Sequence, residues 1–205
     1  MREARSHRVV GRSRTGYHRC HDAELDRPLP TGEDEDLLMI RATLCFLVEE
    51  HPVPRVLLGR KKRGFGVGKL NGIGGKIAPG EKPEQAIQRE VEEEIGVKIP
   101  PASLHNAGQI TFRFPFRPED DHEVHLFVAS SWDGDPVETE EMAPRWVPTG
   151  DIPFAQMWQD DAYWLPLVLQ GVRVHGEFVF GADNESVTEW SLRGAPTPRW
   201  KEAAR

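Results

Sequence analysis

The stretch from Gly74 to Val97 constrains the fold of this chain more than any other, because a glycine-rich loop runs directly into a helix that carries many carboxylates. Pro83 can begin that helix, since the N–H it lacks would have no partner there. Gly96 can end it with a left-handed cap, so the sequence predicts about three to four helical turns between the two. The helix also has a face to bury, with apolar side chains four residues apart at Ile87, Val91 and Ile95.

Three glutamates of this helix, Glu90, Glu93 and Glu94, are spaced so that they lie within one turn on one face. Like charges this close repel each other unless a cation compensates, and carboxylate oxygens suit a hard divalent ion such as Mg²⁺ or Mn²⁺. Taken alone, the charge run also fits a solvated helix face that Arg89 and Lys98 would neutralise.

The glutamates belong to a longer pattern of fixed positions. Five residues separate Gly75 from Glu81, and seven more separate Glu81 from Arg89 and Glu90. An apolar residue, any residue, the adjacent pair of Glu93 and Glu94, any residue, and a glycine with an apolar neighbour then follow. This pattern, with no position missing, resembles the Nudix box of the Nudix hydrolase superfamily.

The resemblance implies an α/β class structure, the Nudix fold, which is an α/β/α sandwich with a mixed central sheet. It implies hydrolysis of a nucleoside diphosphate linked to another group, with the box acting as a loop, helix and loop that hold the metal. We expect Mg²⁺, with Mn²⁺ as a possible substitute, bound by the Gly75 carbonyl and by Glu90, Glu93 and Glu94. We assign Arg89 and Glu81 to a salt bridge that fixes the loop against the helix.

The 205 residues favour one domain with appendages. We expect an unstructured extension over residues 1–36, a Nudix domain over 37–193 and a tail over 194–205. A formal net charge of −7 argues against binding of a nucleic-acid polymer, because nonspecific affinity depends on Lys and Arg neutralising phosphates.

Only two cysteines are present, Cys20 and Cys45, so we expect no disulfide framework and a reducing compartment. No apolar run approaches the length of a membrane span, and no secretory signal is evident. We therefore expect a cytoplasmic monomer with no membrane association. The Arg- and Ser-containing leader up to Arg19 only faintly suggests an organelle transit peptide.

Apolar runs and alternation predict the remaining elements. Strands are expected at 39–48, 55–60, 103–116, 123–129 and 144–147, one or two helices within 154–169, and a hairpin of 176–180 with 187–192. The basic, glycine-rich segment 61–76 lacks the spacing of a phosphate-binding P-loop, and its local composition favours a mobile connector.

Beyond the box, residues 39–193 resemble the oxidised purine nucleoside triphosphate hydrolases, the 8-oxo-dGTP diphosphatase type of MutT homologue. The stretches that carry this resemblance include VLLGRKKRGFG, LNGIGGK, AGQITFRF, ETEEMAPRW and FAQMWQDDAYW. It implies hydrolysis of oxidised or modified purine nucleoside triphosphates, such as 8-oxo-dGTP and 2-oxo-dATP, to the monophosphate and pyrophosphate. Such an activity would cleanse the nucleotide pool and prevent DNA damage.

Matched position by position, the resemblance gives Trp158 the role of stacking on the purine, and Asp160 with Asp161 that of reading its edge. Asn71 would bind the base from the other side and Lys61 would lie near the sugar and phosphates. Pocket walls would be formed by Thr43, Phe65, Phe112 and Met142. Glu141 matches a loop glutamate implicated in metal binding or as a base.

Each assignment has a structural alternative. Adjacent buried carboxylates cannot both ionise cheaply, so one of Asp160 and Asp161 would hold a proton and donate it to the base, but either could instead cap a helix. Trp158 could simply pack beside Trp164 in the core. Glu141 could belong to a solvated acidic loop.

Two positions depart from the resemblance. Leu70 stands where mammalian members carry tryptophan, and His122 stands at the pocket rim where they carry methionine. These differences affect the expected substrate preference more than the reaction. The alternatives are hydrolysis of another nucleotide conjugate such as ADP-ribose, or a Nudix module that binds a nucleotide without turnover.

Overall fold

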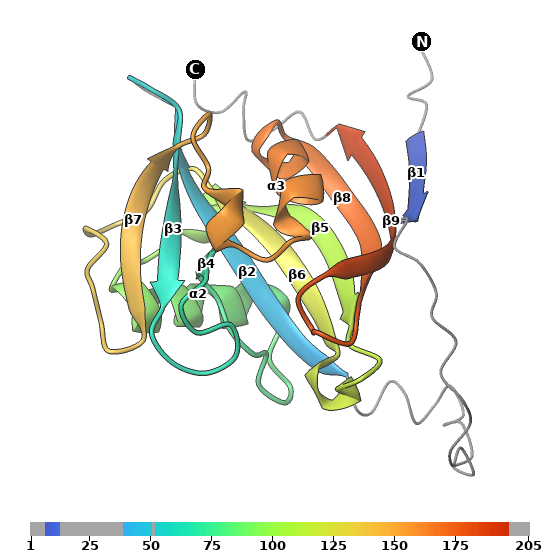
Figure 1. Cartoon of the computed structure of the whole chain (residues 1–205). Coiled ribbons are helices and arrows are strands. Elements are labelled where there is room, and N and C mark those ends of the chain that lie inside the picture. The colour runs from blue at the N-terminus through green and yellow to red at the C-terminus, as the bar shows by residue number, and fades with distance from the viewer. Residues whose placement is uncertain (1–6, 13–38, 51, 197–205) are drawn as a thin grey trace, which may run out of the picture.

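A computed structural model of the protein describes residues 7–12, 39–50 and 52–196 (Figure 1). The strands are β1 (His7–Arg12), β2 (Ile40–Glu49), β3 (Arg55–Lys61), β4 (Leu70–Asn71), β5 (Leu104–Arg113), β6 (His122–Ala129), β7 (Met142–Pro148), β8 (Val172–Phe180) and β9 (Val187–Pro196). They form one sheet in the order β1-β9-β8-β5-β6-β2-β3-β4, with β7 paired to β3. Because β2–β6 and β5–β8 are parallel while other pairs are antiparallel, the sheet is mixed, as expected.

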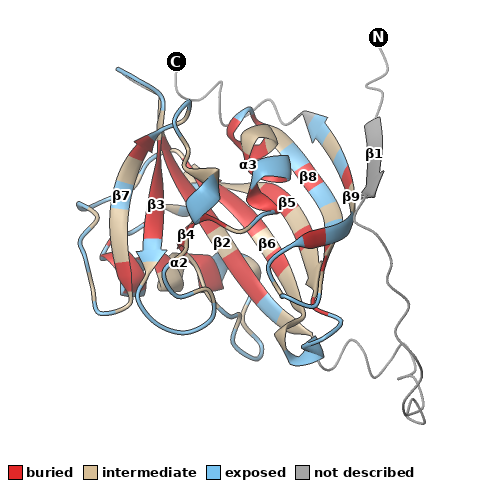
Figure 2. Cartoon of the chain, in the orientation of Figure 1, coloured by how far each residue is buried: buried red, intermediate tan, exposed pale blue. Residues whose placement is uncertain are grey.

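In the described part of the chain two α-helices, α2 (Pro83–Ile95) and α3 (Asp161–Leu169), cover opposite faces of this sheet (Figure 1). Two consecutive residues of β2 show why. The side chain of Phe46 belongs to the apolar cluster under α3, and that of Cys45 belongs to the cluster under α2. Both faces of β2 are therefore buried, and the buried residues run along the centre of the sheet (Figure 2). The α/β/α arrangement predicted from the sequence is confirmed.

Helix α2 has the predicted ends. Pro83 is its first residue, and Gly96 caps it with a φ of 73° while its N–H donates to the Glu92 carbonyl at 3.0 Å. The predicted stripe is fully buried, at Ile87, Val91 and Ile95. Burying each such side chain is worth about 1.5–3 kcal/mol, so packing against the sheet holds the helix in place.

The sheet opens next to the box. Strands β2 and β3 pair only at Val48–Val56 and Glu49–Arg55 and then separate. The loop before α2 runs along the edge of β2 that β3 leaves unpaired. There Ile73 exchanges two backbone hydrogen bonds with Cys45 at 2.7 and 2.9 Å. This pairing carries Gly74 and Gly75 to the middle of the domain.

Most predicted strands are confirmed within a few residues, but the strand expected over 103–116 ends at Arg113. Phe114 instead begins a turn, in which its carbonyl accepts the Arg117 N–H at 2.7 Å. Pro115 has no N–H for a sheet ladder, and Phe116 is 65% exposed rather than on a buried face. The expected helical region separates into a short 3₁₀ turn, Phe154–Gln156, and α3.

The predicted boundaries differ from the structure at both ends. Strand β1 lies within the expected extension 1–36 and pairs antiparallel with β9, and β9 extends to Pro196, past the expected boundary at residue 193. The rest of the extension and residues 197–205 lie outside the described residues. None of the helices described is long and apolar enough to cross a membrane.

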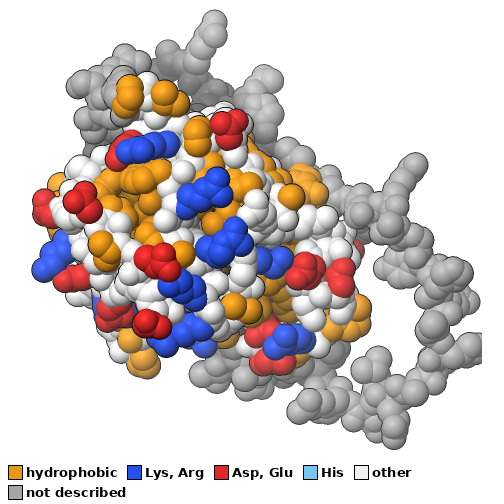
Figure 3. Space-filling view, turned by 60° about the vertical axis from the view of Figure 1, so that its left-hand side comes forward, with side chains coloured by type: hydrophobic (Ala, Val, Ile, Leu, Met, Phe, Trp, Pro, Cys, Tyr) orange, Lys and Arg blue, Asp and Glu red, His pale blue; other side chains and the backbone are white. Residues whose placement is uncertain are grey.

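The face that carries β7 and β3 shows a row of Lys and Arg side chains flanked by carboxylates and apolar side chains (Figure 3). Both signs of charge alternate there. This face is therefore not the uniformly basic surface that binds a nucleic-acid backbone.

Candidate active site

The glycines of the box allow the loop to approach its neighbours closely. A Cβ on Gly75 would lie 2.4 Å from Oε2 of Glu90, and a Cβ on Gly74 would lie 2.2 Å from the Thr43 carbonyl oxygen of β2. The Gly74 N–H donates to Oε2 of Glu94 at 3.1 Å. The loop is thus held between β2 and the glutamate face of α2.

Arg89 organises the exposed side of the box. Its guanidinium donates to both carboxylate oxygens of Glu81, at 3.0 and 2.9 Å, to the Lys76 carbonyl at 3.2 Å, to Glu90 at 2.7 Å and to Glu93 at 3.2 Å. The hydrogen bonds from Arg89 lower the pKa of Glu81 to about 2. The salt bridge predicted between Arg89 and Glu81 is present, and it joins the loop to the helix.

Glu94 is the buried member of the three glutamates, with only 3% of its surface exposed. Its Oε1 lies 4.0 Å from the Lys61 ammonium of β3. Burial raises the pKa of the Glu94 carboxyl to about 7, with Glu90 and Glu93 adding repulsion, while Lys61 and the Gly74 N–H act in the opposite direction.

The donor set on this helix face suits a divalent ion. It consists of carboxylate oxygens on consecutive turns, and the repulsion among them is what a cation would relieve. In the present side-chain positions, no three His, Cys, Asp or Glu side chains within residues 39–50 and 52–196 converge closely enough to bind a metal. Arg89 pairs with Glu90 and Glu93, so these carboxylates must turn away from it to share an ion.

The Gly75 carbonyl has another partner. It accepts the Thr43 backbone N–H at 2.8 Å and the Thr43 hydroxyl at 3.3 Å. Both lone pairs of this oxygen are therefore engaged with β2, so binding of a metal by Gly75, which remains a prediction, would require the longer hydroxyl contact to open.

A cavity of about 620 Å³ opens beside the box. Its walls include the following residues expected at the site: Thr43, Lys61, Phe65, Asn71, Gly75, Phe112, Glu141, Met142, Trp158, Asp160 and Asp161. Arg89, Glu90, Glu93 and Glu94 do not line it, and they adjoin its end through Gly74, Gly75 and Lys61. The structure thus places a box of carboxylates at the end of an aromatic cavity.

The adjacent carboxylates Asp160 and Asp161 are 2% and 1% exposed. Asp160 occupies the N-cap position of α3 without a capping hydrogen bond from its side chain. Its Oδ2 instead accepts the Trp164 indole N–H at 2.8 Å, and Oδ2 of Asp161 accepts the Trp158 backbone N–H at 2.9 Å. The capping alternative is therefore not the arrangement found.

Burial raises the pKa of both carboxyls, to about 6 for Asp160, and repulsion from Asp160 raises the pKa of Asp161 further. The Lys69 ammonium acts in the opposite direction on both. A pair of this kind retains a proton more readily than an exposed aspartate, so it can donate and accept hydrogen bonds at once.

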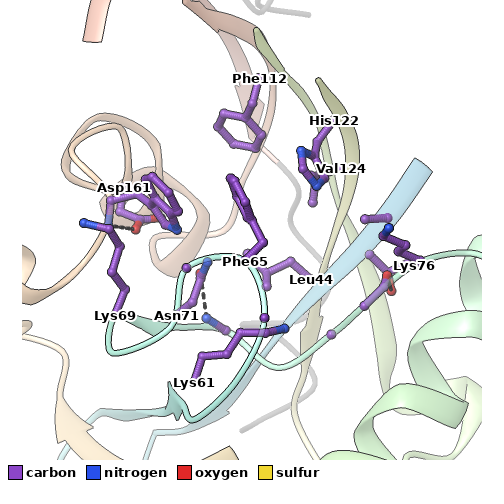
Figure 4. A pocket seen from close by; sticks show the side chains of 18 of the residues that line it. Leu44, Lys61, Phe65, Lys69, Asn71, Lys76, Phe112, His122, Val124 and Asp161 are labelled. Atoms are coloured by element: carbon purple, nitrogen blue, oxygen red, sulfur yellow. Dashed lines mark hydrogen bonds between the residues drawn. The ribbon is translucent and has the colours of Figure 1, made fainter. Parts of the chain in front are cut away.

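Asn71, on β4, also lines the cavity (Figure 4). Its Oδ1 accepts the Gly72 N–H at 2.8 Å, which leaves the amide NH₂ as a donor for a ligand. A few polar groups therefore line a largely apolar space, which is the usual composition of a small-molecule site.

Trp158 is half-buried and packs against the apolar cluster that contains Trp164, although it makes no ring contact with Trp164 itself. Phe65 stacks on it, with ring centroids 5.1 Å apart and an interplanar angle of 17°. On its other side Phe65 contacts His122, at 5.0 Å and 31°. Figure 4 shows Phe65 in the middle of the cavity, between the Asp161 side and His122.

The other expected residues take peripheral places. Thr43 and Met142 are buried in the floor, and Phe112 packs against Phe178 with ring centroids 6.1 Å apart. Glu141 lies at the rim, where its carboxylate pairs with Arg63. Glu141 is thus neither in a purely solvated loop nor joined to the α2 glutamates.

Lys69 was not among the residues expected at the site. Its ammonium lies 4.7 Å from the Trp158 ring centroid and 3.3 Å from a carboxylate oxygen of Glu185. The glycine-rich segment 61–76, which locally indicated a connector, is a wall of the cavity. No fixed residue spacing marks this segment in the sequence as a wall of the cavity. It is recognised as a wall only because it lies beside α3 and β6 in the fold.

Comparisons with known proteins agree with this geometry. A model of the NUDIX domain matches residues 38–168. An oxidized purine nucleoside triphosphate hydrolase of Mus musculus is 47% identical over 139 residues, covering 68% of this chain and 86% of that protein. A protein of the same name from Danio rerio is 50% identical over 142 residues, covering 69% and 89%.

Among solved structures, a MutT protein from Bacillus halodurans superimposes with a TM-score of 0.64 at 21% identity, covering 75% of this chain and 97% of that one. At this identity the similarity shows a shared fold. Together the comparisons confirm the resemblances drawn from the sequence.

Proposed function

The chain belongs to the Nudix family, whose hydrolases generally use a divalent metal ion, and we propose that it hydrolyses oxidised purine nucleoside triphosphates to the monophosphate and pyrophosphate. The observation that carries the proposal is the buried pair Asp160–Asp161, which faces an aromatic cavity whose far end is the glutamate box. One end can recognise a purine edge and the other can act on phosphates.

Recognition begins with the base. A purine would stack on the Trp158 indole, a contact worth about 1–3 kcal/mol per base. Asp160 and Asp161, sharing a proton, would donate to and accept from its edge, and the Asn71 amide would bind it from the other side. Since a protonated and an ionised carboxyl can exchange roles, the pair can match several modified purine edges.

Catalysis would occur at the box. Glu90, Glu93 and Glu94 are the residues that would hold the ion, which we take to be Mg²⁺. When bound, the ion neutralises phosphate charge and lowers the pKa of the attacking water. Release of pyrophosphate requires the bond between the α- and β-phosphates to break, and a box glutamate would take the water's proton.

Other residues would position these groups. Arg89, with Glu81, keeps the loop against α2, and Lys61 neutralises Glu94 at the entrance to the cavity. Glu141 at the rim, now paired with Arg63, is placed to approach a bound phosphate chain if that pair opens. A monomeric state and a cytoplasmic location remain predictions.

A substrate panel tests the proposal. With Mg²⁺ present, kcat/KM should be much higher for 8-oxo-dGTP and 2-oxo-dATP than for dGTP and ADP-ribose, because only the modified purines offer the edge that the aspartate pair is expected to select. Equal rates on dGTP would contradict a role in cleansing the nucleotide pool. Faster turnover of ADP-ribose would indicate a different Nudix hydrolase, and binding without phosphate release would indicate a non-catalytic module.

A further inference from the structure

Three rings lie in a row in the cavity, and the middle one, Phe65 on a loop, stacks on Trp158 and is tilted by 31° against His122. Phe65 lies between Trp158 and His122, with centroid separations of 5.1 and 5.0 Å. Phe114 backs the stack, meeting each of the three rings edge-on, at 5.7 Å from Phe65, 6.4 Å from His122 and 6.3 Å from Trp158. Trp158 and His122 therefore bound a slot that accommodates one flat ring.

The outer rings are fixed, whereas the middle ring is not. Trp158 precedes α3 and His122 begins β6, which is paired with β2 and β5 in the centre of the sheet. Phe65 is 42% exposed and stands between Gly64 and Gly66, whose φ angles are 77° and 75°. Residues without a Cβ on both sides allow the backbone to rotate and withdraw the phenyl ring.

The chemistry of His122 suits a stacking role. Its Nδ1 is hydrogen-bonded to the Asp120 carbonyl, and because a carbonyl can only accept, Nδ1 carries the proton. Nε2 then holds a lone pair, and among the described residues it has no hydrogen-bond partner. Burial lowers the pKa of the ring, so it is held neutral, flat and in one orientation.

We propose that His122 is a substrate-binding residue that forms the second stacking face for the purine opposite Trp158, and that the Phe65 ring occupies this base site until the nucleotide displaces it. The inference rests on the proposed function for the identity of the ligand as a purine nucleotide. It gives a role in substrate specificity to a position at which mammalian members of the family carry methionine. A base held between two rings gains the stacking energy twice, and a smaller pyrimidine covers less of each ring.

The test compares side chains of similar size at position 122. His122→Phe keeps an aromatic face, and His122→Leu removes it with little change in volume. We expect His122→Leu to weaken binding of 8-oxo-dGMP about tenfold by calorimetry, and to raise KM for the triphosphate similarly with kcat nearly unchanged. His122→Phe should restore both values to near wild type, and thermal unfolding of each variant checks that the fold is kept.

Phe65→Ala tests the occupied slot. Removal of a competing ring should lower the dissociation constant for the monophosphate, because the nucleotide no longer has to displace the phenyl group. Equal affinities of wild type and His122→Leu, or failure of His122→Phe to recover affinity, would overturn the second stacking face. Unchanged or weaker binding by Phe65→Ala would overturn displacement of Phe65.

These measurements are separable from the substrate panel. If the wild-type protein does not favour 8-oxo-dGTP, the proposed function fails. The stacking inference is then judged by the affinity of the same variants for dGMP, with dCMP as the pyrimidine comparison.

Discussion

Single residues on α2 have distinct roles although their chemistry is the same. The side chain of Glu93 is 61% exposed and contacts Arg89, whereas the neighbouring Glu92 is directed to Lys98, at 3.2 Å. Glu93→Gln should lower kcat by about 10²-fold or more while leaving the fold intact, because a neutral amide neither binds the ion well nor accepts a proton. Steady-state kinetics with 8-oxo-dGTP measures this.

Glu92→Gln is the matched control, since it removes one charge from the same turn of the same helix. It should retain near wild-type kcat. Normal turnover by Glu93→Gln, or equal losses in both variants, would show that the box carboxylates do not have separate roles.

The buried aspartates should make stability depend on pH. Folding raises their pKa values, so between the ordinary aspartate pKa and the raised values the folded state binds more protons than the unfolded chain. The free energy of unfolding therefore rises as pH falls through about 6 toward about 4. Because the pKa of Asp161 is raised well above its usual value, the upper end of this window lies higher for Asp161 than for Asp160.

Asp161→Asn removes the penalty of burying a charge at this position and still offers an oxygen to the Trp158 N–H. We expect the variant to be more stable than wild type by about 1–3 kcal/mol near pH 7.5, with a smaller gain near pH 5, and to lose activity toward 8-oxo-dGTP. Thermal unfolding at both pH values measures the gain, with the exposed Asp151→Asn as control. A gain that does not shrink at the lower pH would contradict raised pKa values in the aspartate pair.

At the scale of elements, the glycine loop determines where the glutamates can lie. A methyl group on Gly74 would meet backbone of β2, at 2.2 Å from the Thr43 oxygen, and no side-chain rotation relieves that contact. Gly74→Ala should therefore displace the loop, abolish most activity, and lower Tm by several degrees, corresponding to about 1–3 kcal/mol. Kinetics and thermal unfolding of one preparation measure both.

Gly150→Ala serves as control, because a Cβ there has no atom within 4 Å. It should leave both values near wild type. If Gly74→Ala were equally harmless, the close contact with β2 would not be what places the loop.

Some elements of this fold can be predicted from the sequence, and others cannot. Helix α2 and its ends were predictable because proline, glycine and a four-residue apolar repeat act locally. The glutamates expected at the site were identified by their own spacing of three and four residues on this helix. By contrast, β4 has two residues and depends on pairing with β3, and the early end of β5 depends on a turn. Such features arise from tertiary contacts that no short window contains.

The cavity was predictable only in part, for the same reason. The family resemblance predicted which residues line the cavity. It did not predict that Phe65 lies between Trp158 and His122, or that Lys69 approaches the indole. Nor did it supply the hydrogen bonds that engage the Gly75 carbonyl. Each of these depends on side-chain positions across three or more strands and loops.

At the scale of the whole molecule, the sheet separates the two tasks of the site. The face under α2 supports the box, and the face under α3 supports the aspartate pair and the aromatic rings. The loop 73–77 passes through the opening between β2 and β3 and connects the two. Reaction and recognition thus meet where the sheet is interrupted, which accounts for their wide separation in the sequence.

The positions of the two apolar clusters and of β1 also predict the effect of truncating the N-terminal part of the chain. Among the residues whose burial is described, both apolar clusters begin in β2, whereas β1 pairs along the edge of β9. Deleting residues 1–38 should leave kcat/KM within about threefold of wild type, lower Tm slightly, and expose an unpaired strand edge that promotes self-association. Deleting only residues 1–6 keeps β1 and should change none of these. Light scattering, thermal unfolding and kinetics on both proteins distinguish the outcomes, and loss of activity at unchanged Tm in the longer deletion would instead place part of the extension in the active site.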